Sequence, residues 1–241
     1  MMPAAAPLNS VTVGVLAMQG AFAEHQKVLS KLSCKIKVIP ILVRTNEDLQ
    51  KCHALIIPGG ESTTIALLAR LAGILDPLKE FAKTHPIWGT CAGAILLSSQ
   101  AVGLKKGGQD LFGGVGICVA RNGWGTQVES FEAELEVKGL REGERGFHGV
   151  FIRAPVVLSF LPQQPDDPPI QVVARLSADV VPPLAGLDID PSIKTDQTDV
   201  VALRQGMHLV TTFHPELTKD NRFHEYFVRE CVLPSVQAST R

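Results

Sequence analysis

The sequence predicts an α/β fold with a mainly parallel central sheet, helices on both faces of that sheet, and a small antiparallel element. Short β-branched and apolar runs alternate with stretches of helical period from residue 11 to residue 97, as they do in parallel sheets covered on both faces. Farther along, residues 128–137 alternate between apolar and acidic side chains, which is typical of a half-exposed antiparallel strand.

The elements of the first part follow from apolar runs and helix-start signals. Buried strands are expected at 11–17, 36–42 and 54–57, and over the short apolar run that ends at Gly89. Helices are expected from Phe22, from Thr45, over 62–71 and around 78–83. Ligands of such sheets bind outside the carboxyl ends of the strands. We therefore expect functional residues in the loops that follow the third and fourth strands.

The second part has a different character. Residues 103–116 are rich in glycine and predict a loop. Strands are expected at 128–137, 147–153, 156–160 and 172–174, and a hairpin across Gln205-Gly206 joins 200–204 to 208–213. A final amphipathic helix is expected over 221–231.

These elements predict one large domain. We expect a disordered lead-in at 1–10, the domain itself at 11–233, and a flexible tail at 234–241. Residues 161–198 contain seven of the 16 prolines and several aspartates, with little regular period, and predict a surface insertion.

Composition excludes several classes of protein. The 241 residues have a formal net charge of −1, which offers no electrostatic surface for nucleic acid or an anionic membrane. No apolar run approaches the roughly 20 residues of a membrane span, and the N-terminus lacks the pattern of a secretory signal. The five cysteines are widely spaced, with no C-x-x-C pair, so we expect a cytoplasmic protein without a disulfide framework or a metal site.

The segment Gly89-Thr90-Cys91-Ala92-Gly93 follows an apolar run and precedes a helix-forming one. This is the pattern of a sharp strand-to-helix turn with a cysteine as nucleophile. The two glycines allow strand and helix to approach closely, and the turn would expose the sulfur of Cys91 at a helix N-terminus, which favours a thiolate. A buried cysteine that acts only as a small hydrophobic residue is an equally good interpretation of this segment alone.

A cysteine nucleophile needs a base and a group that orients the base. Among seven histidines, His214 ends an expected strand and precedes Glu216 by two residues. In an extended chain, residues two apart point the same way, so Glu216 can reach the far ring nitrogen of His214. The alternative is a solvated histidine beside a surface acid.

An oxyanion hole is the next requirement. The N–H of Ala92 directly follows the nucleophile, and the loop Gly59-Gly60 lets a second backbone N–H approach closely. Each such donor contributes about 3 kcal/mol to acyl-transfer catalysis. The same loop is also an ordinary turn before a helix capped by Ser62 or Thr63, and both interpretations can hold together.

Taken together, these motifs resemble the class I (triad) glutamine amidotransferases, whose sheet is flavodoxin-like. The motifs are PGGESTT at 58–64, GTCAG at 89–93 and HPE at 214–216. Finer blocks are similar to the glutaminase subunit of pyridoxal 5′-phosphate synthase, the Pdx2/SNO/YaaE family. Those blocks are GVLAMQGAFAEH at 14–25, RNGWG at 121–125, SFEA at 130–133, GVFIRAP at 149–155 and FHPELT at 213–218.

The resemblance implies hydrolysis of L-glutamine to L-glutamate and ammonia by a Cys91–His214–Glu216 triad. It implies an oxyanion hole at Gly60 and Ala92. It further implies glutamine-binding positions at Gly59, Gly60, Glu61, Arg121, Ile152 and Arg153. An arginine suits the α-carboxylate of an amino acid, but the residue types alone favour Arg121 and Arg153 equally, and either could form a surface ion pair instead.

The resemblance also implies a partner. Ammonia would pass to a Pdx1/SNZ-type (β/α)8-barrel synthase in a large hetero-oligomer, and Met18, Gln19 and Gly20 would lie where that synthase docks and completes the oxyanion hole. No cofactor is implied, because pyridoxal 5′-phosphate is the product of the complex. We therefore expect weak glutaminase activity alone and stronger activity with the synthase.

Three alternatives remain at this point. One is a triad glutaminase of another pathway, against which the blocks at 14–25 and 149–155 argue. Another is a binding subunit that has lost catalysis, although all three triad residues are present. The last is a cysteine peptidase or a stress protein on a related sheet.

Overall fold

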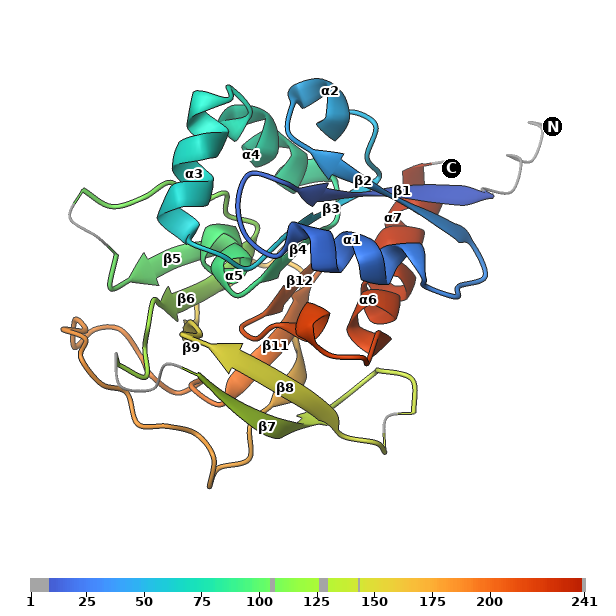
Figure 1. The fold of residues 1–241 in the computed structure, drawn as a ribbon. Coiled ribbons are helices and arrows are strands. Elements are labelled where there is room, and N and C mark those ends of the chain that lie inside the picture. Colours follow the sequence, from blue (N-terminus) through green and yellow to red (C-terminus); the bar gives the residue numbers. More distant parts are fainter. Residues whose placement is uncertain (1–8, 105–106, 126–129, 143, 240–241) are drawn as a thin grey trace.

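A nine-stranded sheet with the strand order β2-β1-β3-β4-β12-β11-β10-β7-β8 runs through the molecule, and a second sheet, β5-β6-β9, lies beside it (Figure 1). The computed structural model describes residues 9–104, 107–125, 130–142 and 144–239. Residues 1–8 of the lead-in predicted at 1–10, and the start of the strand predicted at 128–137, lie outside these residues, whereas Ser10 already belongs to β1.

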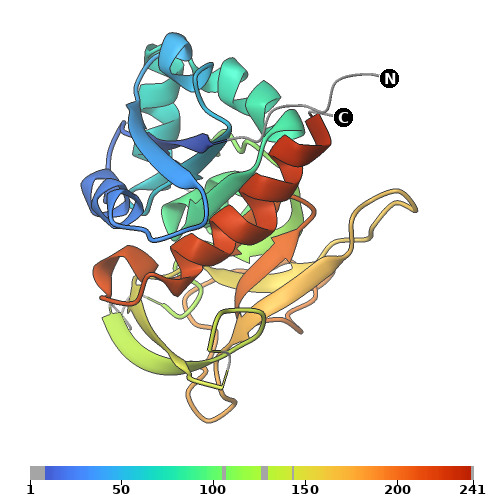
Figure 2. The same ribbon diagram turned by 90° about the vertical axis from the view of Figure 1, so that its right-hand side faces the viewer.

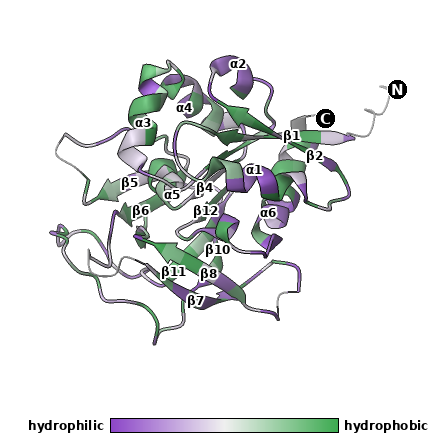
Figure 3. Cartoon of the chain, in the orientation of Figure 1, coloured by the Kyte–Doolittle hydropathy of each residue, from purple (hydrophilic) through white to green (hydrophobic). Residues whose placement is uncertain are grey.

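One half of the large sheet is parallel, as predicted. Its strands, from the edge inward, are β2 (Lys37–Val43), β1 (Ser10–Leu16), β3 (Ala54–Ile57), β4 (Ile87–Thr90) and β12 (His208–Thr211). Every residue of β3, β4 and β12 is buried, because helices cover both faces. Hydrophobic residues are accordingly concentrated along these strands, whereas hydrophilic residues gather on α2 and β7 (Figure 3).

Alternating residues of these strands form two cores. Val13, Ile56 and Trp88 point to one face, where they join residues of α1 (Phe22–Ser30) and α6 (Arg222–Phe227). Leu55 and Ile87 point to the other face, which is covered by α3 (Ser62–Leu71), α4 (Leu75–Thr84) and α5 (Ala92–Leu97). The short helix α2 (Asn46–Leu49) begins with a capping box at Thr45, the predicted helix start.

The other half of the sheet is antiparallel and larger than the small element predicted. It consists of β11 (Val200–Gln205), β10 (Ile170–Arg175), β7 (Ser130–Val137) and β8 (Phe147–Ile152). The predicted hairpin joins β11 to β12, so these strands extend the parallel half instead of forming a separate unit. In β7 the alternation is as predicted, with Ala133 and Leu135 buried between exposed glutamates.

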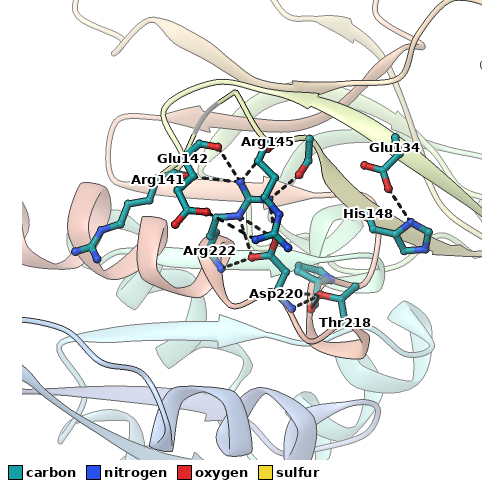
Figure 4. Close-up of polar contacts among 10 residues, drawn as sticks. Glu134, Arg141, Glu142, Arg145, His148, Thr218, Asp220 and Arg222 are labelled. Atoms are coloured by element: carbon teal, nitrogen blue, oxygen red, sulfur yellow. Dashed lines mark hydrogen bonds and ion pairs between the residues drawn. The ribbon is translucent and has the colours of Figure 1, made fainter.

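A single arginine fixes the loop between β7 and β8 to the C-terminal part of the chain. Arg222 donates hydrogen bonds to the carbonyl oxygens of Arg141, Glu142, Arg145 and Gly146 at 2.6–3.2 Å, and its guanidinium pairs with Asp220 at 2.7 Å (Figure 4). At the far end of this hairpin, the N–H of His214 donates to the carbonyl oxygen of Val150 in β8 at 2.9 Å. The hairpin therefore lies against the segment that follows β12.

Two strands were not predicted. β5 (Ser98–Val102) and β6 (Val115–Ala120) form the small sheet with β9 (Val156–Phe160), and β6 begins within the stretch predicted as loop. Glycines at 113, 114 and 116 obscure the start of the apolar run, and β5 directly follows α5 without a turn signal. No regular element occupies 107–114, in agreement with the glycine content.

The predicted surface insertion at 161–198 is wrong for its central part. β10 lies inside the large sheet between β11 and β7, and partly buried side chains such as Leu184, Leu187 and Ile193 pack on the core. The N–H of Ala185 donates to the carbonyl oxygen of Gly123 at 3.1 Å. The strand predicted at 172–174 is present within β10, but prolines on both sides made the whole stretch resemble a surface loop, so the place of this strand inside the sheet was not predicted.

The structure also differs from the flexible tail predicted at 234–241, because the chain is helical up to Ser239. Beyond α6 the chain continues through a π-helical turn (Val228–Val232) into α7 (Leu233–Ser239), and Figure 2 shows this C-terminal stretch as a rod along one side of the molecule. Leu233 and Val236 pack against the core, which explains why the helix extends past the predicted end. Residues 240–241 lie outside the described part.

Candidate active site

Cys91 lies at a strained turn between β4 and α5. Its backbone has φ 47° and ψ −104°, a conformation that a side-chain-bearing residue rarely adopts and that is typical of functional sites. A Cβ on Gly89 would lie 2.3 Å from the carbonyl oxygen of Gly93, and one on Gly93 would lie 2.1 Å from that of Ile57. The glycines therefore have the steric role predicted from the sequence.

The sulfur of Cys91 is less exposed than predicted. The residue is 7% exposed, and it lines a cavity of about 220 Å³ instead of projecting into solvent. The carbonyl oxygen of Ile152, at the end of β8, lies 3.9 Å from Sγ. A small substrate can therefore reach the sulfur only by entering this cavity.

Strand pairing brings Cys91 and His214 together from distant parts of the sequence. Thr90 of β4 pairs with Thr211 of β12, and the N–H of Cys91 donates to the carbonyl oxygen of Thr211 at 2.9 Å. Because the two strands are adjacent and parallel, the segments that leave them begin at the same edge of the sheet. Both Cys91 and His214 line the cavity there.

His214 and Glu216 form a buried pair. Nδ1 of His214 lies 2.7 Å from Oε1 of Glu216, whose side chain is fully buried. Burial by itself lowers the pKa of His214, but hydrogen bonds and charges from Cys91 and Glu216 raise it above its ordinary value. The raised pKa favours the imidazolium form of His214 beside the sulfur, an arrangement that supports a cysteine nucleophile.

The loop at Gly59 closes the site from a third side. A Cβ on Gly59 would lie 2.3 Å from Cε1 of His214 and 3.3 Å from Cβ of Cys91, so only glycine fits between them. The predicted partner-docking loop contacts this segment directly. The N–H of Ala21 donates to the carbonyl oxygen of Gly59 at 3.1 Å, and the N–H of Glu61 donates to Oε1 of Gln19 at 2.8 Å.

Most predicted site residues line the cavity. They are Gln19, Gly60, Glu61, Cys91, Ala92, Arg121, Ile152, Arg153 and His214. Gly59, Met18, Gly20 and Glu216 lie behind or beside this lining. Sequence reasoning missed four lining residues, Ser62, Ile95, Asn122 and Pro155. Asn122 and Pro155 belong to the blocks at 121–125 and 149–155, which could have indicated them.

The two candidate arginines differ in their partners. Nη2 of Arg121 lies 2.8 Å and 3.1 Å from the two carboxylate oxygens of Glu61, so this guanidinium is already paired. Arg153 is exposed at the mouth of the cavity, at φ 43°, and no carboxylate of the described residues lies within ion-pair distance of it. Of the two, Arg153 is the one without an ion-pair partner among the described residues.

A cysteine on a strand-to-helix turn, a buried His–Glu pair just after the neighbouring strand, and a small cavity lined by the cysteine and the histidine are the features of a triad glutamine amidotransferase. The family described as the SNO glutamine amidotransferase family matches residues 15–233, and the chain belongs to this family. That range includes every predicted site residue.

Similar proteins agree with this assignment. The chain is 44% identical over 230 residues, 91% of this chain and 85% of the relative, to the "Probable pyridoxal 5′-phosphate synthase subunit PDX2" of Arabidopsis thaliana. It is 43% identical over 219 residues, 90% and 99% of the two chains, to the "Pyridoxal 5′-phosphate synthase subunit PdxT" of Herpetosiphon aurantiacus. A solved structure entitled "Crystal structure of glutamine amidotransferase" superposes with a TM-score of 0.69 at 42% identity, covering 90% and 97% of the two chains.

In the part of the chain that the structure describes, no group of three or more histidines, cysteines or acids could hold a metal ion. No described helix is long and apolar enough to cross a membrane. All five cysteines are free.

Proposed function

We propose that the protein is the glutaminase subunit of a pyridoxal 5′-phosphate synthase, which hydrolyses L-glutamine to L-glutamate and ammonia. The observation that supports this most directly is the placement of Cys91 and the His214–Glu216 pair at one small cavity, in a chain of the SNO family. The names of the two relatives supply the pathway.

Cys91, His214 and Glu216 perform the chemistry. The sulfur of Cys91 attacks the carboxamide carbon of glutamine, and the protonated His214 gives its proton to the departing ammonia. The resulting thioester is hydrolysed by water, from which His214 takes a proton, and glutamate leaves. Glu216 orients the imidazole through Nδ1 and stabilises its charged form throughout.

The oxyanion of each tetrahedral intermediate is held by backbone N–H groups. Ala92 is the first residue of α5, where no carbonyl of the helix accepts its N–H. Gly60 lines the opposite side of the cavity. Each donor lowers the barrier by about 3 kcal/mol when it points at the oxyanion.

Charged groups at the cavity fit the amino-acid end of glutamine. Arg153, which has no ion-pair partner in the described part of the chain, binds the α-carboxylate in a forked contact. Glu61 has the charge that suits the α-ammonium group, and Arg121 holds its carboxylate in place. The remaining predicted binding positions, Gly59 and Ile152, shape the walls near the sulfur.

The ammonia acceptor in this proposal is a Pdx1/SNZ-type (β/α)8-barrel synthase in a large cytoplasmic hetero-oligomer. The loop Met18-Gln19-Gly20 is the docking element. Gln19 contacts Glu61, and a Cβ on Gly20 would lie 1.8 Å from the carbonyl oxygen of Gly59. A partner that moves this loop therefore also moves the oxyanion loop. The protein itself requires no cofactor, since pyridoxal 5′-phosphate is made by the complex.

Ammonia release from L-glutamine tests the proposal, with the wild type and Cys91→Ala, each with and without the synthase. We expect release that requires Cys91 and increases with the synthase. Release that requires Cys91 but is the same with and without the synthase would indicate a glutaminase of another pathway. Absence of release under every condition would indicate a binding subunit that has lost catalysis.

A further inference from the structure

A buried chain of polar side chains lies behind the triad. Oε1 of Glu216 lies against Nδ1 of His214, whereas Oε2 has no hydrogen-bond partner among the described residues. Nε2 of His25 lies 3.4 Å from Oε2, within ion-pair distance. His25 is in α1, and its side chain is fully buried. A buried carboxylate oxygen is costly unless a donor lies close to it.

His25 is itself held on three sides. Its Nε2 lies 3.3 Å from Oγ1 of Thr90, the residue before the nucleophile. Its Nδ1 lies 2.9 Å from Nε2 of His224 in α6. Trp88 presents its ring at near-perpendicular angles to both imidazoles, with centroids 5.5 Å from His25 and 4.8 Å from His224. The ring of His25 therefore has one orientation.

These contacts determine where the protons lie. Burial, together with nearby His224 and His214, lowers the pKa of His25 well below its ordinary value, and burial lowers the pKa of His224 to about 3. Both rings are therefore neutral near pH 7, and each has one N–H. The negative oxygen of Glu216 favours the tautomer of His25 with its proton on Nε2. Its Nδ1 then accepts from Nε2–H of His224.

We propose that His25 is a positioning residue of the triad, whose Nε2–H holds the second carboxylate oxygen of Glu216, with His224 selecting the tautomer that makes this possible. The inference rests on the proposed glutaminase function. Glu216 is then held by the hydrogen bond to His214 at Oε1 and by the Nε2–H dipole of His25 near Oε2, which fixes the orientation of the carboxylate. Without His25, one oxygen of the buried carboxylate faces no donor, so Glu216 is held less firmly and orients the imidazole of His214 less well.

Three variants separate this role from packing. His25→Leu removes the donor, whereas His25→Gln places an amide N–H near the former Nε2. His208→Gln is the matched control, because His208 is also buried, with Nδ1 accepting from the N–H of Ile87 at 3.3 Å, but lies at the opposite end of β12. The measurements are kcat and KM for glutamine in the complex with the synthase, the pH profile of kcat, and the midpoint of thermal unfolding.

We expect His25→Leu to lower kcat by about tenfold to a hundredfold, the effect of losing one charge-assisted hydrogen bond, with KM nearly unchanged. The acidic limb of the pH profile shifts to higher pH, because the thiolate–imidazolium pair forms less readily. His25→Gln recovers part of kcat. His208→Gln lowers the unfolding midpoint while kcat and the pH profile stay as in the wild type.

The pH dependence of Cys91 alkylation by iodoacetamide, followed by mass spectrometry on the isolated chain, provides a readout that needs no glutaminase activity. In His25→Leu, alkylation at neutral pH slows and its half-maximal pH rises. If the wild type alkylates rapidly but releases no ammonia, the proposed function fails and the alkylation data still decide the role of His25. An unchanged alkylation profile in His25→Leu, or equal losses in His25→Leu and His25→Gln that follow stability alone, would overturn the inference.

Discussion

His214 and Glu216 are joined through Nδ1 and Oε1 at 2.7 Å, although the chain between them is not extended. Pro215 begins a 3₁₀ turn (Pro215–Leu217), and His214 precedes it with φ −109° and ψ 82°. The fixed φ of proline favours the first position of such a turn. The two side chains therefore meet at the tight turn, not along one face of a strand as the spacing predicted.

Glu216→Gln tests how much the His214–Glu216 hydrogen bond contributes to kcat. An amide at this position can present an N–H to Nδ1 and disfavours the imidazolium, so we expect kcat to fall about a thousandfold or more while KM changes little. Glu230→Gln, at a partly exposed carboxylate in the π-helical turn, is the control and should retain wild-type kcat. A Glu216→Gln enzyme with kcat within a few-fold of the wild type would show that Glu216 does not orient His214.

Gly59→Ala tests the close approach of the oxyanion loop to the catalytic histidine. The added methyl group would lie 2.3 Å from Cε1 of His214, so the imidazole has to move away from Cys91. We expect kcat to fall about a hundredfold or more, as is typical for catalytic groups displaced by about 1 Å.

Gly116→Ala in β6 is the matched control for this change, because its new Cβ would meet nothing closer than 3.5 Å. Both variants should be folded by circular dichroism, and ammonia release should distinguish them. Equal activity of the two would mean that His214 tolerates displacement and that the loop has no positioning role.

The local turns that carry the site residues could be predicted from the sequence, whereas the pairing of the distant strands that bring them together could not. The turn at Cys91 and the Gly-Gly loop follow from local steric rules, which glycine spacing reports directly. Pairing of β4 with β12 depends on contacts between residues more than 100 apart, so only the resemblance to a family could place Cys91 beside His214.

Sequence patterns could not predict two features of the site. His25 appeared only as the last residue of the block at 14–25, because its partners Glu216 and His224 come from the far end of the chain. The choice between Arg121 and Arg153 also stayed open, since it depends on which guanidinium Glu61 occupies. In both cases tertiary contacts decide the role of a residue whose type is ambiguous.

Arg153→Ala tests the assignment of the α-carboxylate contact. Because Arg153 has no ion-pair partner among the described carboxylates, we expect KM for glutamine to rise about tenfold to a hundredfold, with a smaller change in kcat. Arg153→Lys, which retains the charge but not the fork, should give an intermediate KM. Arg175→Ala is the control, because Arg175 lies on β10 and is paired with Asp199. KM for glutamine should not change in this variant. An unchanged KM in Arg153→Ala would move the contact to Arg121.

Acid should destabilise the fold through its buried neutral histidines. Burial lowers the pKa of His208 to about 4, whereas the unfolded chain titrates near 6.5. Between these values the unfolded state binds more protons than the folded state, so the stabilising contribution is present above about pH 6.5 and is lost as the pH falls toward 4. For His208 alone this loss amounts to about 2 kcal/mol between pH 7 and pH 5. Urea unfolding at both pH values should therefore show a smaller pH-dependent loss in His208→Gln than in the wild type, and identical losses would mean that His208 is already protonated in the folded protein.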